Sequence, residues 1–302
     1  MKLLEALDEF YLEQAVRGNS SITIKDYKIK LDLFYRFVGN IDLSELNLHL
    51  CRSYYLELRV TRENTVTVQT YVRALRAFLN FLFLNEFIKE DLCHKFKLPK
   101  ARQNHLDILN DSEIERIYNC FSGGDFYSLR NRVIISLMLD SGLRRNEIVT
   151  ALRAKVHLEE RFLIVTGKGN KQRAVSYGVN TQNLLKQYLM ICPLHDNLII
   201  KVSNSGVPEG ITDDTLKNLF RKLKVNAKIP RIHAHLFRHT FATRYLENGG
   251  NIYTLQLLLG HTSLEMVKKY LHLAQSRVRK EFVNYSPLDR YLDALEGAKK
   301  PP

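Results

Sequence analysis

The 302-residue chain lacks long hydrophobic runs, paired cysteines and an export signal. No run of about 18 apolar residues occurs, which predicts that no segment spans a membrane. The four cysteines are scattered without a CxxC pair, so neither a zinc knuckle nor a disulfide framework is indicated. The first residues, MKLLEALDEF, carry acids where a signal peptide has a basic and then an apolar region. These absences predict a protein of the reducing cytoplasm.

Positive charge is plentiful and unevenly distributed along the chain. The formal net charge is +13, of which residues 1–100 contribute +2 and the remainder +11. A basic excess in a folded chain indicates a polyanionic partner, and nucleic acid is the simplest one. The alternative is a basic soluble protein without such a partner.

The first hundred residues have apolar side chains at spacings of three and four, which is typical of amphipathic helices. In the first such segment the predicted buried face contains Leu4, Leu7, Tyr11 and Ala15. Four helices of this kind would form a compact bundle. The helical segments cover residues 3–16, 22–38, 44–58 and 65–87.

A break in this periodicity divides the chain. Residues 94–109 are basic, contain Pro99 and predict a linker. After it a helix begins, with Asp111 as N-cap, or Asn110 with Glu113 in a capping box. We therefore expect a helical domain over residues 1–96, a linker over 97–106 and a second domain over 107–302.

The second domain combines helices with one hairpin. A helix is expected to end at Gly142. Two β-rich runs, Phe162–Thr166 and Arg173–Tyr177, flank a Gly/Lys/Asn turn and predict a hairpin. The fold class is therefore mainly α with a small antiparallel β-sheet. The further helices are expected at 181–191, 212–226, 235–248 and beyond 252.

The segment HAHLFRHTFATRY, residues 233–245, holds three histidines and two arginines. His235 and His239 would share a helix face and could bind zinc. The zinc signature HExxH needs a glutamate where Leu236 stands, and no acid occurs between Asp214 and Glu247. A metal site is therefore disfavoured.

The same segment suits an anion better. Arg238 lies three residues after His235, on the same face, and an arginine binds phosphate oxygens in a bidentate manner. A histidine beside it can exchange a proton near neutral pH. On these residues alone, a basic surface helix explains the pattern equally well.

Three further stretches carry candidate residues. SGLRRNEI places Arg144 after a helix break, and TGKGNKQR places Lys168 at the tip of the hairpin. The latter is not a P-loop, because GxxxxGK[ST] is absent, so a nucleoside triphosphate is not implied. LLGHTSLEMVKKYLHL places His261 before a helix and Tyr270 near its end.

This ordered set resembles the tyrosine site-specific recombinases, the integrase family that includes the Xer-type enzymes. The resemblance extends from the helical N-terminal segment through residue 275. Each short motif is common by itself, but the order and spacing of the motifs together are specific to the family. It is carried by GLR, GKGNK, HLFRHTFAT and LLGH, and by Arg144, Lys168, His235, Arg238, His261 and Tyr270.

The resemblance implies roles for the basic residues. Arg144 and Arg238 would clamp the scissile phosphate. Lys168 would protonate the departing 5′ oxygen, and Lys171 is a less favoured occupant of that role. Two guanidiniums and a lysine can spread the developing charge without a metal. We therefore expect no metal and no cofactor.

The resemblance also implies roles for the histidines and the tyrosine. Tyr270 would be the nucleophile, His235 the acid/base residue beside it, and His261 a second phosphate ligand. His239 would support the site by packing or hydrogen bonding, and Glu147 matches a supporting position. Free tyrosine has a pKa of about 10, so it needs a proton acceptor and positive potential to attack.

The spacing of two of these residues makes a structural prediction. His261 and Tyr270 are nine residues apart. One unbroken helix would separate them by about 13 Å and place them on opposite faces. We therefore expect a break between them.

The implied partners are double-stranded DNA with inverted-repeat sites and further copies of the chain, two per site and four in a synapse. The two domains would form a clamp around the duplex. The C-terminal segment 284–302 would dock on a neighbouring subunit. Because EMVKKYLHL departs from the TTxxYTH of Xer enzymes, a mobile-element recombinase is favoured over Xer-type dimer resolution. A non-catalytic DNA-binding regulator and a type IB topoisomerase are the rival readings.

Overall fold

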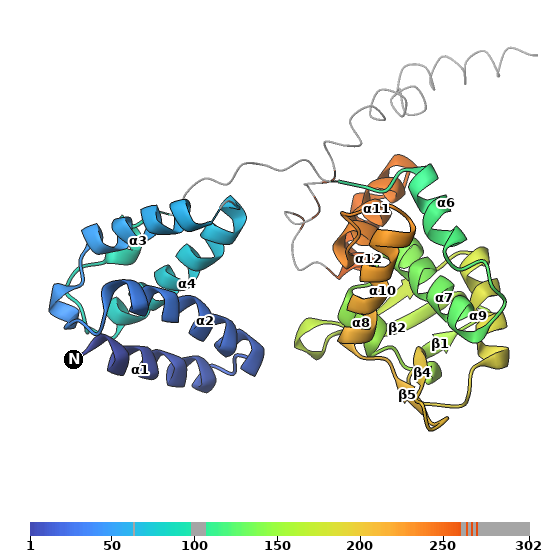
Figure 1. Ribbon diagram of the computed structural model, residues 1–302, viewed down its shortest axis with the longest axis horizontal. Coiled ribbons are helices and arrows are strands. Elements are labelled where there is room, and N and C mark those ends of the chain that lie inside the picture. The colour runs from blue at the N-terminus through green and yellow to red at the C-terminus, as the bar shows by residue number, and fades with distance from the viewer. Residues whose placement is uncertain (63, 98–106, 261–263, 265–266, 268–269, 271–302) are drawn as a thin grey trace, which may run out of the picture. The chain divides into compact units, whose positions relative to one another are not determined.

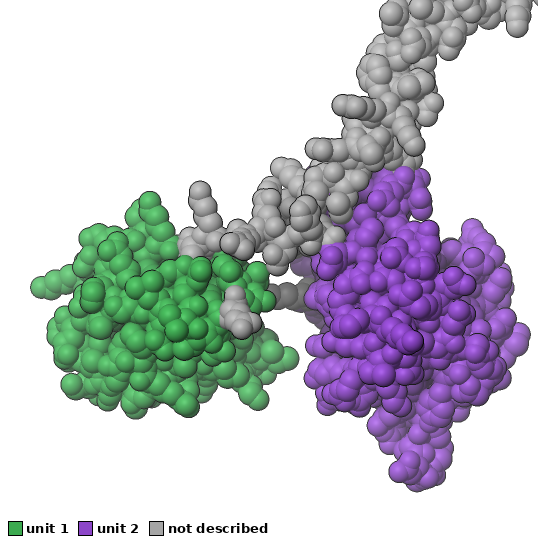
Figure 2. Space-filling view, turned by 45° about the horizontal axis from the view of Figure 1, so that its top comes forward, with its two compact units in different colours: residues 1–104 green, residues 105–302 purple. Residues whose placement is uncertain are grey.

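The computed structural model describes residues 1–62, 64–97, 107–260, 264, 267 and 270, without the side chain of Lys168. The chain divides into two compact units, residues 1–104 and 105–302 (Figure 2). The expected domain bounds stay a prediction, because most of the linker lies outside the described residues. Within the described part, every helix is too short or too polar to span a bilayer.

The first unit is helical, as predicted (Figure 1). Asparagine or serine side chains begin three of its four main helices by accepting hydrogen bonds from backbone N–H groups of the first turn. Its elements are α1 (Leu3–Val16), α2 (Ser21–Val38), η1 (Leu43–Glu45), α3 (Leu48–Thr61), α4 (Thr65–Leu84) and α5 (Leu92–Lys95).

The buried face of α1 differs from the predicted one. Leu4 is 45% exposed and Ala15 is exposed, whereas Leu3 and Phe10 are buried together with Leu7. Helix α1 packs on α2 and α4, and the Phe10 ring meets aromatic rings of both helices edge-on. The aromatic packing of Phe10 therefore rotates the helix away from the face that spacing alone suggested.

The second unit surrounds α7, which packs on both α9 and α11 (Figure 1). Its fold, mainly α with small antiparallel sheets, is the predicted class. The helices are α6 (Asp111–Asn119), α7 (Phe126–Ser141), α8 (Arg145–Val149), η2 (Arg153–Lys155), η3 (Lys168–Asn170), α9 (Val179–Ile191), α10 (Asp213–Asn226), α11 (Ala234–Glu247) and α12 (Ile252–Leu259). The strands are β1 (Val156–His157), β2 (Phe162–Thr166), β3 (Gln172–Ser176), β4 (Ile200–Val202) and β5 (Pro208–Gly210).

The three-stranded sheet has the order β1-β2-β3, with antiparallel neighbours. The predicted bounds of β2 are confirmed, whereas β3 lies one residue earlier than predicted, because Gln172 already pairs with Thr166. Gly169 and Asn170 adopt positive φ angles in the turn. The hairpin β4–β5 was not predicted, since its three-residue strands are too short to show alternation.

Two predicted helix ends are present in the second unit. Of the two candidate caps for α6, Asn110 holds the position, and its side chain and that of Glu113 each accept the other's backbone N–H. Gly142 ends α7 with φ 61°, in the left-handed region. Helix α6 therefore begins after Asn110, and α7 ends at Gly142, two residues before Arg144 of the candidate site.

Candidate active site

Arg238 stands near the middle of the site on α11 and is buried, with 4% exposure. Its Nη1 donates to the Gly142 carbonyl at 2.7 Å and its Nη2 to the Leu259 carbonyl at 2.6 Å. The side chain thus ties the end of α7 to the end of α12. Burial, and after it the nearby charge of Arg144, lowers the pKa of Arg238 to about 9, so the guanidinium keeps its charge at neutral pH.

Arg144 is the N-cap residue of α8 and is partly exposed. Its backbone N–H and its Nη1 donate to the two carboxylate oxygens of Glu147, at 2.8 and 3.0 Å. Its Nη2 makes a long hydrogen bond of 3.5 Å to the Gly260 carbonyl. The guanidinium is therefore oriented from one side while part of it faces solvent.

Glu147 is the buried acid at the centre of this arrangement, with 2% exposure. Arg173 of β3 binds it in a bidentate manner, at 2.6 and 2.9 Å. Burial alone would raise the pKa of Glu147, but the hydrogen bonds from Arg173 and Arg144 lower it by more, to below its ordinary value. Glu147 is therefore a carboxylate shared by two guanidiniums.

The C-terminal end of α12 joins the three arginines. Arg173 donates to the carbonyl of Leu258, Arg238 to that of Leu259, and Arg144 to that of Gly260. The last carbonyls of a helix lack intrahelical partners and form the negative end of its dipole. Hydrogen bonds to three consecutive carbonyls thus hold the three guanidinium groups close together. Sequence reasoning predicted Arg144 and Arg238 there but missed Arg173.

A signal for Arg173 was present in the sequence. In a two-sided strand, residues two apart share a face, and Arg173 precedes the fully buried Val175 by two residues. An arginine on the inward face of a strand needs hydrogen-bond acceptors, and a buried acid both accepts its hydrogen bonds and balances its charge. The spacing of β3 therefore indicated a buried ion pair, although not its acid.

Tyr270 is buried, with 1% exposure, in an apolar cluster of α11 and α12 that includes Phe241 and Leu255. Its phenolic oxygen lies 2.8 Å from Nδ1 of His239, and the two ring centroids are 5.7 Å apart. Burial raises the pKa of Tyr270 to about 12, although the charge of Arg238 acts in the opposite direction. This tyrosine therefore needs a proton acceptor before it can act as a nucleophile.

The structure distinguishes the two histidines of α11. His239 makes the hydrogen bond to Tyr270, whereas the ring centroid of the exposed His235 lies 6.3 Å from that of His239. His239 thus makes a supporting hydrogen bond of the kind predicted for it, and the acid/base role of His235 stays a prediction. His233 precedes α11 as its N-cap residue, and its Nδ1 contacts the carbonyl of Arg231.

The remaining predicted residues are placed only in part. The backbone of Lys168 lies in η3, at the turn between β2 and β3, as expected for a hairpin tip. His261 lies outside the described residues, as does most of the segment up to Tyr270 on which the predicted break falls. The predicted docking segment 284–302 also lies outside them.

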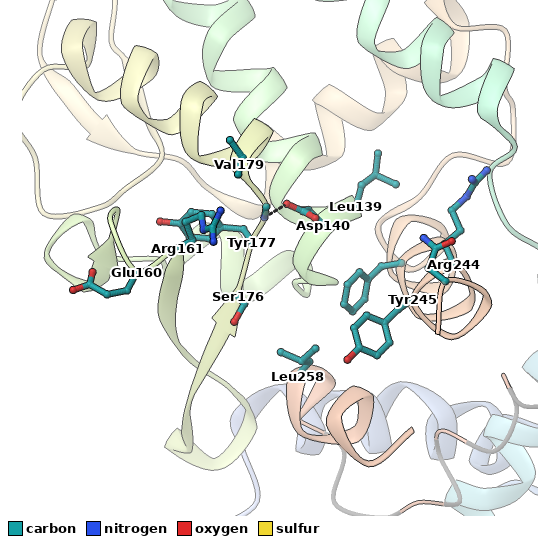
Figure 3. Close-up of a pocket in the computed structure, with 13 residues that line it drawn as sticks. Leu139, Asp140, Glu160, Arg161, Ser176, Tyr177, Val179, Arg244, Tyr245 and Leu258 are labelled. Atoms are coloured by element: carbon teal, nitrogen blue, oxygen red, sulfur yellow. Dashed lines mark hydrogen bonds between the residues drawn. The ribbon is translucent and has the colours of Figure 1, made fainter. Parts of the chain in front are cut away.

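A hollow of about 710 Å³ opens elsewhere in the same unit (Figure 3). At its edge the backbone N–H of Gly178 donates to the Asp140 carboxylate at 2.6 Å, which ties α9 to α7. None of the six predicted catalytic residues is among the described residues that line it. These are Leu139, Asp140, Glu160, Arg161, Ser176, Tyr177, Gly178, Val179, Phe241, Arg244, Tyr245, Asn248 and Leu258.

Comparison with known proteins places most of the chain in one family. The phage integrase family matches residues 107–277, and the phage integrase N-terminal SAM-like domain matches residues 7–86. The tyrosine recombinase XerD of Halalkalibacterium halodurans is 26% identical over 289 residues, which cover 92% of this chain and 95% of the relative. The tyrosine recombinase XerC of Bacillus pumilus is 28% identical, over 91% of this chain and 93% of the relative.

A solved structure shares the fold. The Tn1549 transposon integrase in complex with transposon right end DNA superimposes with a TM-score of 0.75 and 17% identity, over 95% of this chain and all of that one. The family matches together span most of the sequence. The chain therefore belongs to the phage integrase family and is a tyrosine recombinase, an enzyme that cleaves and rejoins DNA strands at specific sites.

Proposed function

We propose that Tyr270 is the nucleophile of this recombinase and that Arg144 and Arg238 hold the scissile phosphate. The Tyr270 oxygen would form a bond to phosphorus as the bond from phosphorus to the 5′ oxygen breaks. The products are a 3′-phosphotyrosyl bond and a free 5′ hydroxyl. A 5′ hydroxyl of another strand then reverses the step, so no ATP is consumed.

One observation supports this proposal most. Arg144, Arg238 and Tyr270 come from separate elements of the chain, yet all lie close to the C-terminal end of α12. Arg144 and Arg238 donate to the carbonyls of Gly260 and Leu259, and the Tyr270 ring belongs to the apolar cluster that contains Leu259. Fixed guanidiniums stabilise charge that develops on a phosphoryl group, because they need no reorganisation as the reaction proceeds.

The proton transfers require further residues. Lys168 would give a proton to the departing 5′ oxygen, and the position of its backbone at a hairpin turn suits a side chain that reaches into a DNA groove. His261 would bind the phosphate. His235 would be the acid/base residue, and the hydrogen bond of His239 to Tyr270 supplies a second acceptor.

Double-stranded DNA with inverted-repeat sites is the proposed substrate. A basic hollow of about 250 Å³ lies beside α8 and α10. One of its lining residues, Arg145, directly follows Arg144 in the sequence. Lysine and arginine side chains around such a hollow neutralise phosphates and release counterions. It is lined by Arg145, Lys217, Phe220, Arg221, Lys224, Ile232, His233 and Ala234.

We further propose that the enzyme acts as a dimer at each site and as a tetramer in the synapse, with the two domains clamped around DNA. The C-terminal segment 284–302 would dock on the neighbouring copy. Its deletion should weaken cooperative DNA binding more than binding to a single half-site. Equal losses in a gel-shift titration would contradict the docking.

For the biological role we propose integration or excision of a mobile element. The support is the departure of EMVKKYLHL from the pattern of Xer enzymes. Xer-type resolution of chromosome or plasmid dimers is the second candidate, and full-length similarity to XerC and XerD proteins favours it. Either role places the enzyme in the cytoplasm, with the DNA on which it acts. Mapping the repeats that flank the gene distinguishes a mobile-element end from a dimer-resolution site.

Replacement of the nucleophile tests the chemistry. The wild-type protein should form a covalent adduct with a nicked suicide duplex whose inverted repeats it has selected from a randomised library. Tyr270→Phe should bind this duplex with the same affinity and form no adduct. A wild-type protein that binds without forming an adduct would support a DNA-binding regulator instead. Relaxation of supercoils without recombination would favour a topoisomerase.

A further inference from the structure

We propose that Arg173 is a positioning residue for Arg144, and through Arg144 for the scissile phosphate. The inference rests on the proposed function, in which Arg144 is a phosphate ligand. Arg173 itself would touch neither the DNA nor Tyr270. It would act by occupying Glu147, the acid to which Arg144 is also bound.

Arg173 uses three directional donors at once. Nη1 and Nη2 bind the two oxygens of Glu147 at 2.6 and 2.9 Å, and Nε donates to the Leu258 carbonyl at 2.8 Å. The side chain is only 13% exposed. It therefore links β3 of the hairpin to α8 and to the end of α12. A lysine has a single ammonium group and cannot span these three acceptors in the same geometry.

The backbone leaves space for this guanidinium. Gly260 has φ +60°, and a Cβ there would lie 3.0 Å from Cδ and 3.1 Å from Nε of Arg173. A Cβ on Gly167 would lie 3.5 Å from Nη1 of Arg173 and 3.6 Å from Oε1 of Glu147. At Gly167 a Cβ would make only ordinary contacts, whereas at Gly260 it would crowd the Arg173 side chain, so the glycine at the end of α12 leaves the room that this guanidinium occupies.

The charge balance explains how Arg173 would act on Arg144. Glu147 is buried, and a buried carboxylate takes whatever cation is within reach. With Arg173 in place, Arg144 gives Glu147 one side-chain hydrogen bond of 3.0 Å, and its Nη2 rests on a long 3.5 Å contact that a phosphate oxygen can replace. Without Arg173, Glu147 would draw Arg144 inward and away from the phosphate.

The test compares two Arg→Lys variants of the full-length protein. Arg173→Lys should form the covalent adduct on the saturating suicide duplex roughly 100-fold more slowly than wild type, because small misplacements of catalytic groups have effects of this size. Its dissociation constant for the duplex should be unchanged. Arg153→Lys is the matched control, since Arg153 also donates to three carbonyls, but at the end of α9. It should react like wild type.

A methylphosphonate at the scissile position separates positioning from general damage. This group lacks one charged oxygen, so the reaction depends less on Arg144. The ratio of the rates on methylphosphonate and phosphate should therefore rise in Arg173→Lys, as in Arg144→Ala, relative to wild type. Because each ratio is measured within one preparation, a loss of folded protein cancels.

The rates of adduct formation separate the positioning role of Arg173 from the proposed function. A wild-type rate for Arg173→Lys, or a defect of equal size on both substrates, overturns the positioning role while adduct formation by wild type upholds the proposed function. A wild-type protein that forms no adduct overturns both.

Discussion

Nδ1 of His239 lies 2.8 Å from the phenolic oxygen of Tyr270, although the residues are 31 positions apart. When the His239 proton is on Nε2, Nδ1 accepts the phenolic hydrogen. The tyrosine is buried, and its pKa is raised to about 12 by that burial. The pair thus holds the proposed nucleophile, whose phenol ionises poorly by itself, against a group that can accept its proton.

Substitution of His239 should slow the cleavage step specifically. Asparagine keeps a polar atom near the Nδ1 position but cannot accept a proton at neutral pH. We expect His239→Asn to form the adduct about 100-fold more slowly, the lower range for loss of general-base catalysis. Partial recovery at higher pH, where hydroxide ionises the phenol, should accompany the defect. If His239→Asn matches wild type in single-turnover assays, the histidine only orients the ring.

Neutralising Glu147 should cost stability in a pH-dependent manner. Its folded pKa lies below the ordinary 4.5, since the arginine hydrogen bonds outweigh the effect of burial. Its contribution to stability is therefore complete above the unfolded pKa and is lost as the pH falls through the folded pKa. Glu147→Gln should lower the unfolding free energy by roughly 3 kcal/mol at neutral pH, because it leaves buried charge unpaired.

Urea denaturation at neutral and at stepwise lower pH measures this difference. The gap between wild type and Glu147→Gln should shrink once the pH drops below about 4.5 and continue to shrink below it. Glu115→Gln, on the exposed face of α6, is the control and should stay close to wild type. A gap independent of pH would show that the pKa of Glu147 is the same in the folded and the unfolded protein, and would contradict the hydrogen-bonded carboxylate.

A methyl group at Gly142 should disturb the junction of α7, α11 and α12. A Cβ there would lie 2.4 Å from Cδ1 of Phe241 and 3.0 Å from Cδ2 of Leu259, and φ is +61°. Overpacking and backbone strain together predict a loss of about 2 to 4 kcal/mol for Gly142→Ala. Calorimetry should show a lower Tm, with Gly124→Ala as control, because nothing lies within 4 Å of a Cβ at that glycine. An unchanged Tm would contradict this packing.

Charge removal at the basic hollow should weaken DNA binding in a salt-dependent manner. Arg221 and Lys224 are exposed residues of α10 that line it. If each neutralises one phosphate, Arg221→Gln with Lys224→Gln should reduce the slope of log K against log salt by about 2. The control pair, Lys186→Gln with Lys201→Gln, removes the same charge from lysines that bind Glu159 and Glu209. If both double variants have the same salt slope, the DNA does not bind at the basic hollow.

Much of this protein follows from local sequence patterns. The long helices of both units, the antiparallel hairpin and the glycine that ends α7 were predicted, because spacing, caps and turn residues act over a few positions. The family resemblance also lies in short words in a set order. The incorrectly predicted buried face of α1 shows the limit of local patterns. The apolar residues that include Leu4 and those that include Phe10 both have helical spacing, so spacing alone does not show which set is buried. Packing on two neighbouring helices decided between them.

Contacts between distant residues required the tertiary structure. His235 and His239 share one helix face, and their spacing alone did not show that His239 lies against Tyr270. The approach of Tyr270 to within 2.8 Å of His239, 31 positions away, is decided by the tertiary structure. In the same way, the strand pattern turns Arg173 inward, but only the packing of β3 against α8 and α12 brings it to Glu147 and to the carbonyl of Leu258. Local periodicity sets the direction of a side chain, and the approach of separate elements sets its partner.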